Sequence, residues 1–474
     1  MPVARTVLPA ITLALLGAVA LAGQPQPELQ GGLELVWGDS APDAASGGDR
    51  LIGNLVTDDG QRVGLDVDSA RLAAGDLYAL QGHRIALLAS ANVPFRAGAT
   101  RATPLRAETI VSAEPAQTAA LSAVTGSQPW VTIACKFSDN TAEPKTVAYF
   151  QTMLSNSPGR LDDYWRTVSY GKVNVAGSTA YGWFTLPHPR SYYVPAGGSA
   201  DLDKLFADCT SAANTTVDFA KFVGINQMFN GDLDGYAWGG NHYATLDGRN
   251  ASWPVTWEPP WGYQHEAPLA HEMGHGFGLP HANNSDLDSD PYDNPWDVMS
   301  DCWDDATSDA TFGTQPKHIG IYSRDRLGWI DAARKLTIGT SGTWANLTLD
   351  AAELASSPNL QMIVVTLPGA AATHYYTVEA RRAGVAGDAY DHNLAGSAVI
   401  VHEIDTTRKE PAWSVDAQTP PANFAYDPGS MFMPGESWSA PNGAFLLSVS
   451  SASANGFVVS IDRAANDLVF RNGF

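Results

Sequence analysis

Residues 271–281 of the chain read HEMGHGFGLPH, and the spacing of their histidines predicts the local structure around them. His271 and His275 lie four residues apart, so on a helix they share one face and can direct their ring nitrogens at a single metal ion. Glu272 projects about 100° further round the helix axis, which places its carboxylate beside the ion as a candidate general base. The spacing therefore predicts a helix that carries a metal site.

Gly278 and Pro280 explain how a third histidine, His281, can reach the same ion. Glycine accepts the positive φ of a sharp exit from a helix, and proline cannot continue the helix. Three neutral imidazoles leave the fourth tetrahedral position open, which is the mark of a catalytic rather than a structural zinc site. The alternative is an ordinary amphipathic helix that carries HExxH by chance, and the added glycine and third histidine argue against it.

The extended pattern HExxHxxGxxH, followed by a methionine-bearing turn, resembles the signature of the metzincin zinc peptidases. Met299, in the sequence YDNPWDVMS at 292–300, stands where that turn is expected. The chain is most similar to the gametolysin-type family, with likeness to immune inhibitor A-like peptidases. This likeness spans about residues 130–335 and includes FSDN at 137–140, SYGKV at 169–173 and RLGWI at 326–330. The resemblance implies a twisted sheet backed by helices, zinc on the three histidines, and Met299 as an apolar floor beneath them.

Two features depart from the family pattern. Many metzincins place a tyrosine two residues after the turn methionine to stabilise the oxyanion, whereas this chain has Asp301. Tyr292 and Tyr322 are candidates to replace it, and the sequence does not choose between them. In addition, no cysteine-switch peptide is recognisable in the first hundred residues.

These observations predict a zinc-dependent endopeptidase that acts on polypeptides. Zinc lowers the pKa of a bound water toward 7, and Glu272 accepts the proton of that water and returns it to the leaving amine. Two other classes stay open: a zinc-binding but catalytically silent adhesion or carbohydrate-binding protein, and a zinc hydrolase that cleaves a non-peptide bond. The intact Glu272 argues against the silent protein.

The composition is that of an exported enzyme. Residues 1–22 have one early charge, an apolar run and small residues near Ala22, as in a secretory signal peptide, so we expect a secreted protein with no membrane span after its removal. A membrane anchor is the weaker alternative, because the run is short for a bilayer. The net charge of −22 and the lack of a basic cluster exclude nucleic acid as a natural partner. Nothing in the sequence fixes the oligomeric state.

The chain divides into several regions of an α+β protein. We expect a small β-rich module at 23–92, a linker at 93–128, the peptidase domain at 129–335 and an antiparallel, sandwich-like β domain at 336–474. The first 106 residues after the signal peptide, 23–128, are either a propeptide or a permanent accessory domain. Within the peptidase domain, the segment 239–244 is the expected edge strand that accepts an extended substrate.

Three cysteines allow at most one intramolecular disulfide. We expect Cys209 to pair with Cys302 if a bond forms, and Cys135 to be a buried apolar residue of a strand.

The loop between His281 and Met299 is rich in aspartate. Such a loop can bind calcium, but it lacks the spacing and closing glutamate of an EF-hand, and a solvated acidic loop is the stronger interpretation.

Overall fold

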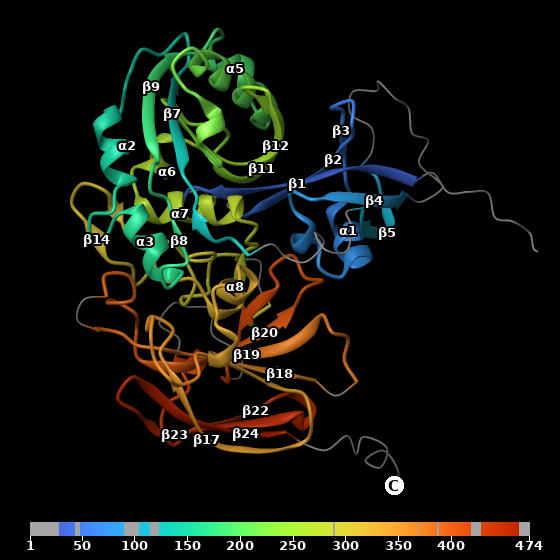
Figure 1. The fold of residues 1–474 in the computed structure, drawn as a ribbon, viewed down its shortest axis with the longest axis vertical. Helices are drawn as coiled ribbons and strands as arrows, with labels where there is room; N and C mark the ends of the chain where they lie inside the picture. Colours follow the sequence, from blue (N-terminus) through green and yellow to red (C-terminus); the bar gives the residue numbers. More distant parts are fainter. Residues whose placement is uncertain are drawn as a thin grey trace, which may run out of the picture.

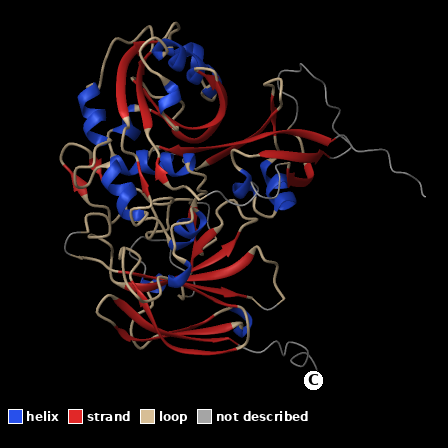
Figure 2. Cartoon of the chain, in the orientation of Figure 1, coloured by secondary structure: helices blue, strands red, loops and turns tan. Residues whose placement is uncertain are grey.

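The computed structural model describes residues 28–42, 48–89, 104–113, 123–287, 290–367, 369–385, 388–418 and 428–463. Across these residues helices and several sheets are mixed, which confirms the α+β class, as Figure 1 and Figure 2 show. The expected signal peptide lies outside the described residues. No helix within the described ranges is long and apolar enough to cross a membrane.

A twisted sheet forms the upper half of the molecule in Figure 1. Its strands lie in the spatial order β9 (Thr179–Thr185), β7 (Trp130–Lys136), β10 (Gly224–Phe229), β12 (Arg249–Glu258) and β11 (Tyr236–Leu246). The first four are parallel, and β11 runs antiparallel to β12. Parallel strands are covered on both faces, which explains why nearly all of β7 and β10 is buried.

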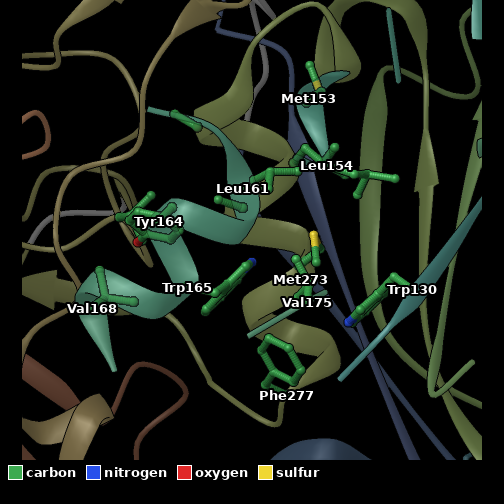
Figure 3. Close-up of a cluster of buried hydrophobic side chains, with 14 of the residues drawn as sticks. Trp130, Met153, Leu154, Leu161, Tyr164, Trp165, Val168, Val175, Met273 and Phe277 are labelled. Carbon is green, nitrogen blue, oxygen red and sulfur yellow. The ribbon is translucent and has the colours of Figure 1, made fainter. Parts of the chain in front are cut away.

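Helices cover both faces of this sheet, and alternate side chains of β7 contact different helices. Val131, Ile133 and Cys135 pack with α5 on one face, whereas Trp130 and Ala134 pack with the metal-site helix on the other. Figure 3 shows this second cluster, in which Trp130 and Trp165 lie close to Phe277. The helices of the region are α2 (Val147–Met153), α3 (Leu161–Val168), α4 (Arg190–Tyr193), α5 (Leu202–Ala213), α6 (Pro260–Tyr263) and α7 (Glu266–Gly276).

The disulfide differs from the prediction. Cys135 of β7 bonds to Cys209 of α5, with their Cα atoms 5.9 Å apart, and Cys302 is a buried free thiol. The expected Cys209–Cys302 pair is therefore wrong. Its two members lie in hydrophobic clusters on opposite faces of the sheet, whereas Cys135 points toward α5.

The N-terminal region continues the same sheet. Strand β1 (Glu28–Ser40) pairs with β4 through residues 28–32, with β2 through residues 32–38 and with β11 through residues 36–40, antiparallel in every case. Strand β5 lies inside the segment that we expected to be a linker, where it pairs with β4, and the short helix α1 was not anticipated. The remaining elements of this region are β2 (Arg50–Val56), β3 (Arg62–Gly64), α1 (Val67–Ala74), β4 (Arg84–Ala89) and β5 (Ala107–Ser112).

Two further sheets form the lower half of the molecule and enclose their own hydrophobic core. One has the order β13 (Ala282–Asn284), β21 (Ala412–Ser414), β20 (Ala398–Asp405), β19 (His374–Arg381), β18 (Met362–Thr366) and β16 (Lys335–Ile338). The other has the order β17 (Gly342–Asp350), β24 (Gly456–Arg463), β23 (Phe445–Ala452) and β22 (Ser437–Ser439). Most pairs are antiparallel as expected, but β16–β18 and β13–β21 are parallel.

Several further elements are short. They are β6 (Gly126–Ser127), β8 (Val173–Asn174), β14 (Ser308–Asp309), β15 (Gly313–Thr314) and α8 (Ile321–Arg326). Strand β13 begins one residue after His281, so the metal-site turn leads directly from the upper half into the lower sheet.

Candidate metal centre

Helix α7 is held rigidly because almost its whole length is buried. Two of its glycines permit close packing at the metal site. A Cβ atom at Gly274 would lie 2.5 Å from the sulfur of Met299, and one at Gly276 would lie 2.7 Å from the ring of Trp130. The HExxHxxGxxH pattern allows any residue at these two positions. Here close packing against Met299 and Trp130 requires glycine at both.

The turn after α7 is a Schellman motif. Gly278 has φ +92°, its N–H donates to the carbonyl of His275, and the N–H of Leu279 donates to the carbonyl of Gly274, both at 3.0 Å. Leu279 also packs in the same hydrophobic cluster as Met273. The turn expected from the sequence is therefore present, and it brings His281 back over the end of α7.

The three predicted histidines meet. The Nε2 atom of His271 lies 3.0 Å from that of His275 and 3.1 Å from that of His281. All three side chains are buried. Sequence reasoning alone thus identified the residues that the fold brings together.

The second nitrogen of each ring is occupied. Nδ1 of His271 donates to the carbonyl of Val298 at 2.6 Å, and Nδ1 of His275 donates to the carbonyl of Leu279 at 2.7 Å. Nδ1 of His281 donates to Oδ2 of Asp49 at 2.9 Å. Carbonyl and carboxylate oxygens only accept, so each Nδ1 carries a proton, and in the neutral form of each ring the lone pair lies on Nε2 and points at the other two rings.

Three converging lone pairs repel one another unless a cation lies between them. Ligands held tetrahedrally about 2.0–2.1 Å from zinc lie roughly 3.3 Å apart, close to the observed separations. Partners on Nδ1 that fix the ring orientation are also typical of metal-bound histidines. The residues present therefore fit a zinc ion.

Asp39 is a fourth ligand candidate, which the sequence did not reveal. One carboxylate oxygen lies 2.8 Å from Nε2 of His281, and the other lies 3.5 Å from Nε2 of both His271 and His275. This second oxygen, Oδ2, is buried and makes no hydrogen bond. Asp39 and the three histidines form one of two groups with metal-ligand geometry among the described residues, the other being His318 with Asp388 and Asp391.

Glu272 is buried next to the histidines, and its Oε2 atom makes no hydrogen bond. Burial, and after it the carboxyl group of Asp39, raise the pKa of Glu272 well above its ordinary value. A nearby divalent cation would oppose this shift. Strand β11 passes so close that a Cβ atom at Gly239 would lie 2.6 Å from Oε2 of Glu272. The predicted base thus faces the predicted substrate strand.

Met299 packs against Gly274 of α7, as expected of a floor residue. Oδ1 of Asp297 accepts from the N–H of Met299 at 2.9 Å and thereby fixes the turn. Asp301, at the position of the missing tyrosine, is used elsewhere, because its carboxylate lies 2.5 Å from the buried ammonium group of Lys317. Within the described part of the acidic loop, no cluster has metal-ligand geometry.

Of the two tyrosine candidates, Tyr292 lies at the site. Its hydroxyl donates to Oδ1 of Asp39 at 3.0 Å and accepts from the N–H of Ser40 at 3.2 Å. Burial, and then the charge of Asp39, raise the pKa of Tyr292, so its hydroxyl keeps its proton. Tyr322 instead packs in a separate cluster, and its hydroxyl accepts from Arg326.

A cleft of about 390 Å³ opens beside His271 and Glu272. Its other walls include Ser40 from the end of β1 and the rings of Trp261 and Trp303.

Comparison of the sequence with protein-family models finds no match, and comparison with curated proteins finds none either. The functional argument therefore depends on the geometry of the site.

Proposed function

We propose that the protein is a secreted zinc endopeptidase of the metzincin type, most like the gametolysin-type enzymes. The observation that carries this proposal is the convergence of His271, His275 and His281 beside the buried carboxylate of Glu272, whose Oε2 atom makes no hydrogen bond. A site that only stores a metal has no need of a buried carboxylate oxygen held next to it without a hydrogen bond.

The surroundings of the site support the same proposal. Strand β11 ends the catalytic part of the sheet and passes beside Glu272. The segment 239–244, expected to be an edge strand, lies in β11, whose outer edge pairs with β1 at Gly239 and Gly240, so an extended peptide could add there only in place of β1. Met299 lies beneath the helix of the first two histidines, and the turn at Gly278 delivers the third.

Bound zinc would supply Lewis acidity, lowering the pKa of a water and polarising the scissile carbonyl. Glu272 then accepts the proton of the attacking water and donates it to the leaving amine. The hydroxyl of Tyr292, a neutral donor that contacts Asp39 at the site, stabilises the oxyanion that forms on the substrate. Strand β11 holds the peptide backbone in register during both steps.

One observation favours a second candidate, a zinc-binding module without catalysis. With Asp39 included, the site has four protein ligands, and a closed set of four is typical of structural zinc. The test is metal content together with cleavage of casein and of a peptide library, for both the secreted form and the purified full chain.

Glu272→Gln should keep one zinc per chain and lose cleavage by about 10²–10⁴-fold, because a general base contributes that much. Glu353→Gln is the matched control, since Glu353 is a largely buried glutamate of the lower half whose carboxylate oxygens also have no hydrogen-bond partner. Zinc retained without cleavage by any form supports the binding module. Cleavage that survives Glu272→Gln refutes the proposed base.

A further inference from the structure

We propose that His318, Asp388 and Asp391 form a second metal site, which binds a divalent cation of the Mn²⁺ type in the lower half of the molecule. The ion would tie the loop after β19 to the segment beneath the candidate zinc centre. This inference goes beyond the proposed function, because it concerns a different site and does not depend on peptide cleavage.

The first step of the argument is the grouping of the three side chains. One ligand atom of each lies within 4.8 Å of the other two. Nε2 of His318 lies 3.2 Å from Oδ1 of Asp388, and the backbone N–H of His318 donates to Oδ1 of Asp391 at 3.0 Å. The three side chains are at most 7% exposed, so a substrate could not reach an ion held between them. Such an ion would therefore be structural.

The second step is that two polar atoms of the group lack partners. Within the described part of the chain, Nδ1 of His318 and Oδ2 of Asp388 are buried and make no hydrogen bond. Protonation of His318 does not solve this, because the Nδ1–H of an imidazolium would have no acceptor. In the neutral ring the lone pair lies either on Nδ1, without a donor, or on Nε2, facing a carboxylate oxygen. A cation supplies the partner that this lone pair and the carboxylate lack.

The third step is the charge of the group. Nε of Arg381 donates to Oδ2 of Asp391 at 2.7 Å, and the same guanidinium lies 3.9 Å from the carboxylate of Glu379. Among the described residues, the ion pairs include Asp388 only with His318, which is charged only when it is protonated. One guanidinium therefore serves two other carboxylates, and the buried anion of Asp388 is left for a cation to balance.

The fourth step concerns the kind of ion. Adjacent ligands of an octahedral ion lie roughly 1.4 bond lengths apart, which gives about 2.9 Å for Mg²⁺ and about 3.3–3.7 Å for Ca²⁺. The 3.2 Å between Nε2 of His318 and Oδ1 of Asp388 lies between these values and fits an ion of intermediate size. Carboxylates suit Mn²⁺, and an imidazole favours a transition metal over Mg²⁺ or Ca²⁺. A carboxylate can bind through both oxygens, and water fills the positions that remain.

The last step is the connection to the candidate zinc centre. The carbonyl of His318 accepts from the N–H of Val298 at 3.4 Å. The carbonyl of Val298 in turn accepts from Nδ1 of His271 at 2.6 Å. Arg381, which binds the group, also donates to the carbonyl of Trp296. An ion in the group would therefore restrain the backbone that orients a zinc ligand.

The test uses the full chain with one equivalent of zinc, which the three-histidine site takes first because it has more imidazole ligands. Mn²⁺ alone is then the probe, because binding removes the sharp electron paramagnetic resonance signal of the free ion. The variants are Asp388→Asn and, as a second choice, His318→Gln. Glu403→Gln is the matched control: Glu403 pairs with His374 at 2.6 Å in the same half, and no third ligand among the described residues joins them.

We expect the wild type and Glu403→Gln to bind one Mn²⁺ per chain. Asp388→Asn and His318→Gln should bind it at least about tenfold more weakly, because loss of a ligand costs no less than loss of a group that orients one. Equal binding by all forms overturns the proposal, and so does an unchanged signal with the wild type. If neither variant folds, electron spin-echo modulation of the wild type decides. Coupling of the bound Mn²⁺ to one imidazole nitrogen supports the site, and the absence of this coupling overturns it.

Hydrogen exchange tests the connection to the zinc centre. Bound Mn²⁺ should slow the exchange of the amides of residues 296–298 in the wild type but not in Asp388→Asn. Exchange that Mn²⁺ leaves unchanged refutes the connection. None of these measurements uses cleavage, so a chain that binds Mn²⁺ as expected but cleaves no peptide keeps the second site and refutes the peptidase.

Discussion

Gly278→Ala tests whether the turn after α7 is required to place the third histidine. Gly278 has φ +92°, and no atom lies within 4 Å of a Cβ built there, so the substitution adds backbone strain without a steric clash. An alanine held at positive φ costs about 1–2 kcal/mol. The nearest allowed left-handed conformation has φ near +57°, so the chain can relieve the strain by rotating roughly 35°.

That relief would disturb the metal site. Residues 278 to 281 span roughly 10 Å at about 3.3 Å per residue, so a 35° rotation at the start of this segment displaces its end by several ångströms unless neighbours absorb it. Metal sites require their ligands within about 0.5 Å of the productive geometry. We therefore expect Gly278→Ala to lose about 1–2 kcal/mol of stability. It should also bind zinc roughly 10–100-fold more weakly, because a change in the groups that orient a metal ligand lowers metal affinity by about that factor.

Gly248→Ala is the matched control. Gly248 lies in the tight turn between β11 and β12, has φ +77°, and also has open space where a Cβ would stand. It should lose a similar amount of stability and keep the wild-type zinc affinity. Urea unfolding of the metal-free protein measures the first quantity, and competition with a chromophoric chelator measures the second. Wild-type zinc affinity in Gly278→Ala refutes the role of the turn.

Three further predictions concern other parts of the molecule. Cys135→Ser should lower the free energy of unfolding by roughly 4 kcal/mol, the chain-entropy value for a loop of 74 residues, whereas Cys302→Ala should lower it by only about 1 kcal/mol. Burial lowers the pKa of His402 to about 3, so it stays neutral in the folded protein but gains a proton in the unfolded chain below about pH 6.5. Stability should therefore fall as the pH decreases from about 6.5 toward 3, and His402→Gln should reduce this slope by up to about 1.4 kcal/mol per pH unit. Lys317→Met leaves the carboxylate of Asp301 buried and unpaired and should cost about 3–5 kcal/mol in urea unfolding.

Each of these predictions has a clear contrary result. Equal destabilisation by the two cysteine variants would mean that the disulfide contributes no more than ordinary packing. An unchanged pH slope in His402→Gln would show that this histidine is protonated in the folded state. Full stability of Lys317→Met would show that the carboxylate of Asp301 finds water or another partner.

The parts of the fold that could be predicted are those coded over short stretches. Helix α3, Leu161–Val168, is coded locally, because its buried residues recur at helical spacing. The strands of the lower half are runs of β-branched and aromatic residues inside the region where a β domain was expected. The residues of the candidate metal centre could be identified for the same reason, since the three histidines, the proposed base Glu272 and the turn all lie within eleven residues.

The parts that could not be predicted depend on pairing between distant segments. Asp49 contacts His281 across 232 residues, and Asp39 is one of 50 acidic residues, at the end of a strand whose sequence shows no ligand pattern. The correct disulfide partner of Cys209 depends on which face of β7 receives α5. Strand β5 is short and exposed in part, so only its pairing with β4 distinguishes it from a loop. Local periodicity carries no information on these contacts.

The charge balance at the candidate metal centre explains why two carboxylates are buried beside three histidines. Three neutral imidazoles add no charge to a divalent ion, so the anions of Asp39 and Glu272 together would balance it inside a buried site. It follows that Asp39→Ala, which removes one of these anions, should bind zinc more weakly than the wild type. Competition with a chromophoric chelator measures this affinity, and wild-type zinc binding by the variant would refute the charge argument.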